Sequence, residues 1–312
     1  ANAALSDFKT IIDNYGNINS INSYYAGKEW GEIWGFKVDR LYQESDFVYG
    51  SDGNIVTETV ASGKGKGQIV NKQTDANAHN QGYLQSGKFV FGPGDVKYVD
   101  VNGDGEITRG ASTLDDHGDL VKIGNTTPRY QYSFRLGADY KGWDASVFFQ
   151  GVGQCDQWGT SALTMAGFNT GDGAIAKRFT IDYWTPENTD AFYPRATNMS
   201  NNTDQWNMCK SDKYLLNMAY LRLKNITVGY TFPAKWTKKA FIQKARLYAS
   251  VENLFTFDHL DDTPVDPEAV ALSTSDTHEY LTNSSSSNYA GGRVGIGTPA
   301  FRSMSVGIQL TF

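Results

Sequence analysis

The end of the chain alternates strictly between apolar and polar residues. From Met304 to Phe312 every second residue is apolar, and the residues between them, from Ser303 to Thr311, are small or polar. A period of two puts the two sets on opposite faces of a β-strand, and about ten residues cross a bilayer when such a strand is tilted. The pattern therefore predicts a strand with one apolar face, which lies either against lipid in a membrane barrel or against the core of a soluble sandwich.

Five further segments are predicted as strands, of which the first is the least regular: 32–43, 130–140, 143–151, 220–231 and 244–257. Only Lys141 and Gly142 separate the second and third segments, which predicts a hairpin with a tight turn. In the fourth segment the apolar residues change parity near Lys224, so this strand is expected either to contain a β-bulge or to leave the membrane there. Together with the C-terminal strand, these segments predict an all-β fold of about six strands.

The connections between these strands differ in length in a regular way. Two are short, at 141–142 and 232–243, and three are long and polar, at 45–122, 152–217 and 258–299. Because successive antiparallel strands reverse direction, the short connections fall at one end of the sheet and the long ones at the other. This asymmetry is typical of bacterial outer-membrane barrels. A soluble sandwich whose long loops gather at a binding end is the alternative.

Composition removes several classes of protein. No run of 18 apolar residues occurs, so no transmembrane helix is expected. The net charge is −6 and the cationic residues are scattered, so nucleic acid is not an expected partner. The first 20 residues lack the charged start and apolar core of a signal peptide, so the chain is expected to be mature or to begin within a longer protein.

One motif has the spacing of a cation site. Residues 100–107, Asp-Val-Asn-Gly-Asp-Gly-Glu-Ile, match the first eight positions of a calcium loop, but position twelve, where a bidentate Glu belongs, is Ala111. The predicted ligands of a structural Ca²⁺, including two later aspartates that could close the shell, are Asp100, Asn102, Asp104, Glu106, Asp115 and Asp116. The alternative is an Asx-rich turn whose side chains bond their own backbone. In either case no catalysis is expected, because a saturated oxygen shell leaves no position for a substrate.

No catalytic residues are predicted. The four histidines have no Ser or Cys partner at a recognisable spacing, and the sequence contains no nucleophile elbow, phosphate loop or zinc motif. His117 follows Asp115 and Asp116, but a solvated loop residue is the preferred interpretation of that pair. Cys155 and Cys209 are expected either to form a disulfide or to remain as two free thiols.

Aromatic residues are concentrated in the long segment 152–217. They are interspersed with Asn, Asp and Thr, and they are Trp158, Phe168, Tyr183, Trp184, Phe192, Tyr193 and Trp206. Flat apolar rings beside amides and carboxylates suit sugars or a protein partner, so Trp158, Trp184 and Trp206 are predicted to bind substrate. The alternative is that these rings pack the segment against itself.

Six blocks of the sequence resemble a known family, in that family's order. They are the segments 32–43, 94–107, 123–130, 142–151, 220–233 and 249–255, which begin with Glu-Ile-Trp-Gly-Phe, Gly-Asp-Val-Lys-Tyr, Ile-Gly-Asn-Thr-Thr, Gly-Trp-Asp-Ala-Ser, Tyr-Leu-Arg-Leu-Lys and Ala-Ser-Val-Glu-Asn. These blocks look like the C-terminal third of a SusC/RagA-type TonB-dependent transporter. The terminal Phe312 is similar to the assembly signal of outer-membrane barrels.

The resemblance implies a fold, a location and partners. Such transporters form barrels of about 22 strands around an N-terminal plug. A SusD-like surface lipoprotein closes over the barrel, and the TonB complex supplies energy for import. Residues 1–312 are thus interpreted as a C-terminal section of a transmembrane antiparallel β-barrel that lacks the plug and TonB box and is completed by the remaining barrel and plug. Phe312 and the short connections would face the periplasm, and the three long segments would be extracellular.

The sequence therefore predicts import of a nutrient oligomer across the bacterial outer membrane. An oligosaccharide is preferred to a peptide because of the Trp and Tyr content of the long segments. The expected partners are a SusD-like lipoprotein, the TonB complex, the rest of the barrel and outer-membrane lipid, and the chain is not expected to be an enzyme. The alternative is a secreted, calcium-stapled β-sandwich that binds carbohydrate without transporting it.

Overall fold

The computed structural model describes residues 2–5, 20–23, 25–159, 164, 177–196, 206–261, 263–268 and 300–312. The predictions for Phe168, for His278, for the Trp206 side chain and for most of the segment 258–299 lie outside this description. Within it, no helix is long and apolar enough to cross a membrane.

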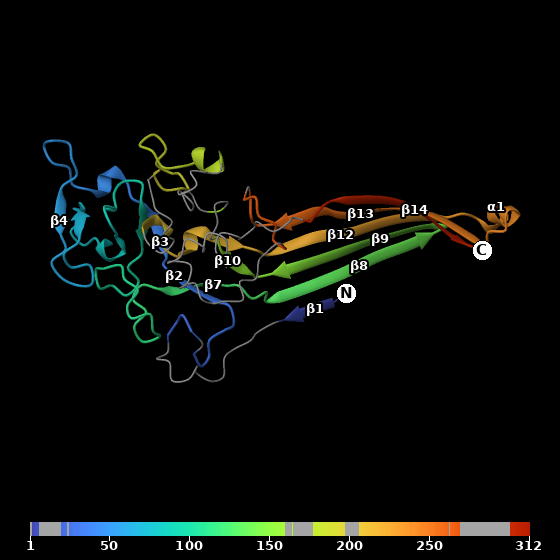
Figure 1. The fold of residues 1–312 in the computed structure, drawn as a ribbon, viewed down its shortest axis with the longest axis horizontal. Helices are drawn as coiled ribbons and strands as arrows, with labels where there is room; N and C mark the ends of the chain where they lie inside the picture. Colours follow the sequence, from blue (N-terminus) through green and yellow to red (C-terminus); the bar gives the residue numbers. More distant parts are fainter. Residues whose placement is uncertain are drawn as a thin grey trace.

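A six-stranded antiparallel sheet is the largest element of the fold (Figure 1). In spatial order its strands are β1 (Asn2–Leu5), β8 (Tyr130–Tyr140), β9 (Trp143–Gly153), β12 (Tyr220–Thr231), β13 (Lys244–Asp258) and β14 (Ser303–Thr311). Five of these were predicted from alternation, and the hairpin between β8 and β9 turns at Lys141 and Gly142 as expected. The connection between β12 and β13 contains α1 (Ala234–Thr237) and the short 3₁₀ helix η7 (Lys238–Ala240).

The predicted strand over 32–43 is wrong as a member of this sheet. The segment forms two short strands, β2 (Glu32–Gly35) and β3 (Val38–Leu41), which pair with β7 (Val121–Asn125) and β6 (Val96–Tyr98). The physical reason is burial, because Phe36 and Tyr42 are 1% and 2% exposed and need protein on all sides. The sixth strand of the sheet is instead β1, near the start of the chain.

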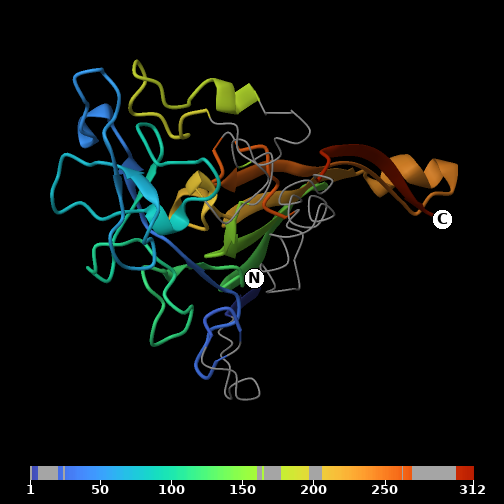
Figure 2. The ribbon, with the colours of Figure 1, turned by 60° about the vertical axis from the view of Figure 1, so that its left-hand side comes forward.

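Much of the chain outside the sheet folds into a compact body at one end of it, which we call the loop unit (Figures 1 and 2). It comprises residues 20–125, 177–196 and 206–217. Its further short elements are η1 (Glu44–Asp46), β4 (Thr57–Thr59), β5 (Ile69–Asn71), η2 (Gly82–Leu84), η4 (Lys177–Thr180), η5 (Trp206–Met208), η6 (Asp212–Tyr214) and β11 (Leu215–Asn217), which pairs with β10 (Asp156–Trp158).

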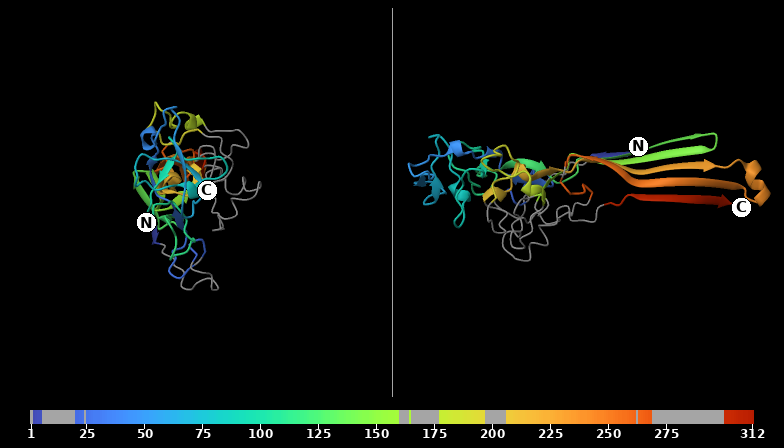
Figure 3. Two further views of the ribbon diagram at one scale, coloured as in Figure 1. Left: turned by 90° about the vertical axis from the view of Figure 1, so that its left-hand side faces the viewer. Right: turned by 90° about the horizontal axis from the view of Figure 1, so that it is seen from above.

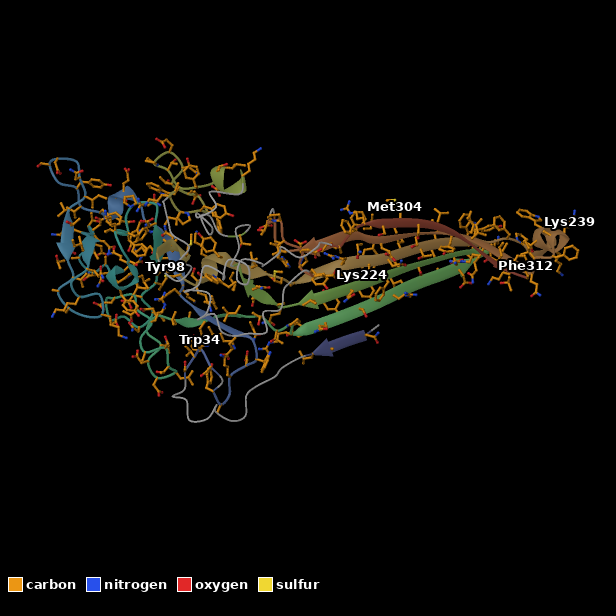
Figure 4. All side chains as sticks on the ribbon, in the orientation of Figure 1. Trp34, Tyr98, Lys224, Lys239, Met304 and Phe312 are labelled. Carbon is orange, nitrogen blue, oxygen red and sulfur yellow. The ribbon has the colours of Figure 1, made fainter. Side chains whose placement is uncertain are left out.

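The loop unit has its own hydrophobic core. The core is built from residues that are far apart in the sequence: Ile21, Phe36, Leu41, Tyr42, Phe47, Leu84, Phe91, Val96, Tyr98, Ile107, Leu120, Trp184, Ala191 and Cys209. Tyr98 stands among the densely packed side chains of this body, whereas Phe312 lies at the opposite end of the molecule (Figure 4). The long connections are therefore not extended loops but parts of one packed structure.

The sheet has two chemically different faces. One row of residues in register across five strands is apolar: Leu136, Val147, Ile226, Val251 and Met304. The neighbouring row points to the opposite side and is small or polar: Gly137, Ser146, Thr227, Ser250 and Ser305. We call these the outer face and the inner face.

Along β14, nothing in the described part of the chain covers the outer face. Met304, Val306 and Ile308 are 78%, 76% and 67% exposed. A sandwich would bury such a row against a second sheet about 10 Å away, but the sheet extends away from the loop unit as a single layer (Figure 3). The soluble β-sandwich alternative is therefore wrong, and the face is of the kind that lies against lipid.

A β-bulge preserves the two faces along β12. The register shifts between Leu223 and Asn225 in the pairing with both neighbours, β9 and β13. The extra residue is Lys224, which changes the parity so that Leu223 and Ile226 both belong to the outer face. The first of the two alternatives predicted from the sequence is thus confirmed.

On the inner face, an ion pair between β9 and β13 passes over a glycine of the strand between them. Arg246 of β13 donates from Nε to Asp144 Oδ1 of β9 at 2.8 Å, and its Nη2 binds the second carboxylate oxygen. The strand between them, β12, carries Gly229 at this position, and a Cβ there would lie 2.5 Å from Arg246 Nη2. The absence of a side chain at Gly229 lets the bridge connect three strands.

We predict that Gly229→Ala weakens the sheet because the new methyl group displaces the guanidinium from Asp144. The expected result is a melting temperature lower by a few degrees, measured from the loss of the folded, fast-migrating band on heating in detergent. Gly137→Ala is the matched control, since its Cβ would meet its nearest neighbour, the Ala145 carbonyl oxygen, at 3.4 Å. In an Asp144→Asn background the Gly229 substitution should have no further effect, and an equal loss in both backgrounds would contradict the mechanism.

Candidate functional site

The predicted calcium loop folds as a series of side-chain to backbone hydrogen bonds. Asp100 accepts from the amides of Gly103 at 2.6 Å and Gly105 at 2.8 Å. Asn102 Oδ1 accepts from the Asp104 amide, and Asp104 Oδ1 accepts from the Glu106 amide, both at 2.9 Å. These are the bonds of the Asx-rich alternative. Each oxygen retains a second lone pair, so the same loop could still ligate a hard cation.

The predicted ligands do not gather into one cluster. Within the described residues, no group of three acidic, His or Cys side chains is placed to hold a metal ion. Glu106 instead turns its carboxylate to the Lys64 amide, at 2.8 Å. Asp116 belongs to a different turn, where its carbonyl oxygen accepts from the amides of Ala111 and Thr113. Calcium binding therefore stays a prediction, and it would rest on Asp100, Asn102 and Asp104 with backbone oxygens.

Asp119 holds this loop in place and was not identified from the sequence. Its carboxylate is fully buried and accepts from the amides of Val101 at 2.8 Å and Thr108 at 2.7 Å, with a longer bond from Asn102. Burial raises the pKa of Asp119, against the effect of the three amide donors. A single Asp beside other acidic residues gives no sequence signal for such a role.

A second buried carboxylate joins distant parts of the loop unit. Asp95 is fully buried and accepts from Arg195 through both oxygens, at 2.9 and 2.8 Å, and from Asn207 Nδ2 at 2.8 Å. Asn207 Oδ1 in turn accepts from the Val96 amide at 2.8 Å. About 100 residues separate Asp95 from these two partners, so the interaction fixes one long connection against another.

Two of the three tryptophans predicted to bind substrate serve as packing residues. Trp158 and Trp184 are each only 6% exposed. Trp184 lies so close to Gly94 that a Cβ there would be 2.5 Å from its ring. The packing alternative therefore describes both rings, and for Trp206 the prediction is unchanged because its side chain is not described.

The two cysteines form no disulfide and lie in separate clusters. Cys209 is fully buried in the core of the loop unit, whereas Cys155 packs with Met218, Leu260 and Val265. The disulfide alternative is wrong for this structure, because the two side chains belong to different cores. Burial raises the pKa of the Cys155 thiol to about 11, which leaves it largely unreactive at neutral pH.

A cavity of about 320 Å³ that the sequence did not reveal lies between the loop unit and the segment after β13. Lys213 lines it, with its Nζ 4.4 Å from the centre of the Phe192 ring. The rest of the lining combines aromatic and polar side chains, among them Tyr193, His259 and Asp261. Burial lowers the pKa of Lys213 to about 8, against the opposing effect of the Asp212 and Asp182 carboxylates. Such a group can bind an anionic or hydroxyl-bearing ligand.

A charged cluster lies on the inner face where the sheet meets the loop unit. Arg222 binds Asp266 at 2.7 Å and also contacts Glu268, which Lys224 reaches at 2.7 Å and Tyr220 at 2.9 Å. These contacts hold the segment after β13 against the inner face, beside a cavity of about 380 Å³. The sequence did carry a signal for this cluster. A charged residue on a membrane strand needs a partner, and Arg222 has the parity of the inner face.

Comparisons with known proteins agree with this architecture. No family model matches the sequence. TonB-dependent receptor P3 of Formosa agariphila is 28% identical over 280 residues, which are 83% of this chain and 25% of the relative. TonB-dependent receptor P26 of the same organism is 29% identical over 176 residues, which are 56% of this chain and 16% of the relative. The chain thus spans a quarter or less of these curated relatives.

Solved structures show the same fold. A structure of the RagAB peptide transporter matches 99% of this chain and 25% of its own, with a TM-score of 0.52 at 17% identity. The RagAB peptide importer in its open-open state matches 96% of this chain with a TM-score of 0.52 at 18% identity. The similar proteins named here are receptors and transporters, which supports a non-enzymatic role. The chain is similar to TonB-dependent receptors, and its fold is that of part of a RagA-type β-barrel.

Proposed function

We propose that the protein imports a nutrient oligomer across the bacterial outer membrane in a TonB-dependent manner, and that this chain supplies part of the barrel wall and its external mouth. One observation carries the proposal. The six-stranded sheet has an exposed apolar face, and it continues at one end into a folded body made from the long connections. A barrel wall needs the first feature, and a mouth that selects substrate needs the second.

The sheet also suggests how the chain sits in the membrane. Aromatic side chains are exposed at both ends of the outer face: Tyr140, Trp143 and Phe312 near the short connections, and Tyr130 and Phe257 near the loop unit. Two such bands mark the two interfaces of a bilayer. The proposed orientation places the short connections in the periplasm and the loop unit outside the cell.

An oligosaccharide remains the preferred substrate, although its structural support has changed. Trp158 and Trp184 no longer contribute to the argument because both are buried. The support now comes from the cavity beside Lys213, where the half-exposed Phe192 ring adjoins polar groups. A peptide is the second candidate, because the similar solved structures are named peptide transporters and importers.

The proposed partners follow from the surfaces that the chain leaves exposed. Trp30, Tyr49 and Ile69 of the loop unit are 55%, 44% and 55% exposed, and such apolar residues suit a SusD-like lipoprotein that covers the mouth. Within the described residues, β1 and β14 are the two edges of the sheet, and we propose that they pair with the remaining barrel. Coupling to TonB would pass through the plug portion of the protein.

We also propose that the loop at 100–106 binds a structural Ca²⁺ with only part of the usual ligand set. The whole receptor is expected to bind calcium in titration calorimetry, and Asp104→Ala should abolish this binding because it removes a side-chain ligand. Asp52→Ala is the matched control, since Asp52 forms a similar turn by accepting from the Asn54 amide at 3.1 Å, outside the motif. If the unaltered receptor binds no calcium, the Asx-rich turn is the complete description of this loop.

The orientation is tested by labelling intact cells with a membrane-impermeant maleimide. Both native cysteines are buried, so single reporters can be added without removing them. Asn54→Cys, on the surface of the loop unit, should label in intact cells, whereas Ala240→Cys, beyond α1, should label only after the outer membrane is permeabilised. Labelling of Ala240→Cys in intact cells would overturn the proposed orientation.

The substrate site is tested with Lys213→Gln. At pH 7 the ammonium is mostly charged, so its loss should weaken binding of acidic oligosaccharides about tenfold, the worth of one charge-assisted hydrogen bond. As the pH rises through about 8 the unaltered receptor should lose affinity, because Lys213 deprotonates, while the variant should show no such change. Lys66→Gln, at an exposed position of the loop unit, is the control.

The same measurement with acidic peptides decides between the two substrate classes. If peptides bind more tightly and depend on Lys213 in the same way, the oligosaccharide preference is wrong. If neither class depends on Lys213, the cavity is not part of the substrate site.

A further inference from the structure

The connection between β12 and β13 exposes large aromatic side chains to solvent. Trp236 of α1 is 60% exposed, and Phe241, immediately after η7, is 90% exposed. We call residues 232–244 the cationic turn. It lies at the end of the sheet opposite to the loop unit, close to Phe312, as the position of Lys239 shows (Figure 4). Exposed rings at a fixed place on a surface mark an interaction site.

Phe241 adopts a backbone conformation that disfavours a bulky residue. Its φ is 58°, in the left-handed region where glycine is usual, and its amide donates to the Lys238 carbonyl at 3.1 Å. Glycine could end the 3₁₀ helix here at no steric cost. The sequence instead places an aromatic ring at this position, and the strained turn holds that ring out from the protein.

Aromatic contacts tie the cationic turn to the outer face of the sheet. Tyr230 contacts the ring of Trp143 at a centroid distance of 4.9 Å and that of Phe232 at 5.3 Å. Phe232 contacts Trp236 of α1 at 6.4 Å. Trp143 and Tyr230 belong to the strands. This row of rings therefore fixes the position of the turn relative to the apolar outer face.

The cationic turn carries several lysines, of which only Lys244 lies near a carboxylate, that of Asp144, in the described part of the chain. Its lysines are Lys235, Lys238, Lys239 and Lys244. The sequence contains no acidic residue from 215 to 251, a range that covers β12, the turn and the first half of β13. The ion pairs found in the described part of the chain do not include any of these four lysines. Lys141 of the neighbouring turn adds a fifth ammonium, 5.0 Å from the centre of the Tyr140 ring.

We propose that the cationic turn is a binding site for anionic phospholipid headgroups of the adjacent membrane leaflet. Trp236 and Phe241 enter the interface between headgroups and acyl chains, and the lysine ammoniums bind the lipid phosphates. Charge complementarity selects an anionic lipid, and continuity with the apolar outer face selects a membrane rather than a soluble partner. The site rests on the proposed function only in requiring that the sheet spans a membrane.

The experiment uses the whole receptor, extracted from outer membranes in mild detergent and reconstituted in vesicles that contain equal amounts of phosphatidylglycerol and phosphatidylcholine. Lipid retained after re-extraction is quantified by mass spectrometry. The unaltered receptor should be enriched in phosphatidylglycerol at least threefold over the vesicle composition. The enrichment should fall as salt is raised, because salt screens the phosphate contacts.

The test variant combines Lys235→Gln, Lys238→Gln and Lys239→Gln, and the control combines Lys64→Gln, Lys66→Gln and Lys72→Gln in the loop unit, which removes equal charge at the other end of the molecule. The first should bring the retained lipid close to the vesicle composition, and the second should leave it enriched. Heat-modifiable migration of both variants confirms that each barrel is folded. The proposal is overturned if both variants retain phosphatidylglycerol equally, or if the unaltered receptor shows no enrichment.

The outcomes separate this inference from the proposed function. If only the lipid site is wrong, the receptor still enters vesicles and retains both lipids without preference. If the sheet does not span a membrane, the proposed function is wrong. The receptor then does not enter vesicles, and surface labelling of Asn54→Cys fails as well.

Discussion

Backbone hydrogen bonding between antiparallel strands is the constraint on which the rest of the structure depends. In lipid no water replaces a missing interstrand bond, so the strands must stay in register over their whole length. Period-two alternation then gives every strand the same outer and inner faces. Where β12 gains an extra residue, the bulge at Lys224 absorbs it and restores the parity of the faces. The ion pair over Gly229 adds a side-chain link across three of the same strands.

The loop unit is stabilised in a different way, because its polar connections lie outside the membrane and are not held by a lipid-facing sheet. It builds a separate core of aromatic and aliphatic residues and fixes distant segments with buried carboxylates. Asp95 accepts from Arg195 and Asn207, and Asp119 accepts from three amides of the loop after Tyr98. A buried carboxylate with several donors is costly to leave unpaired, so these contacts specify one arrangement of the connections.

Elements that are determined by neighbouring residues could be predicted from the sequence, whereas elements that are determined by contacts between distant segments could not. The strands from β8 to β14 followed from alternation because neighbouring residues on one strand decide which face is apolar. The segment 32–43 was misassigned because its apolar residues are buried by distant parts of the chain, such as Lys210, whose carbonyl oxygen accepts from the Phe36 amide. For the same reason the aromatic composition of 152–217 did not distinguish the buried Trp184 from the half-exposed Phe192.

The sequence by itself determined the two-faced strands, the end of the sheet at which the long connections lie, and the resemblance to TonB-dependent receptors. It also determined the charge of the cationic turn, because four lysines without an acidic neighbour are a property of the local sequence. Only the tertiary structure decided that Cys155 and Cys209 stay apart, that Trp158 is buried, and that Lys213 lines a cavity. Those outcomes depend on which distant segments pack together, and such long-range packing produces no periodic pattern in the sequence.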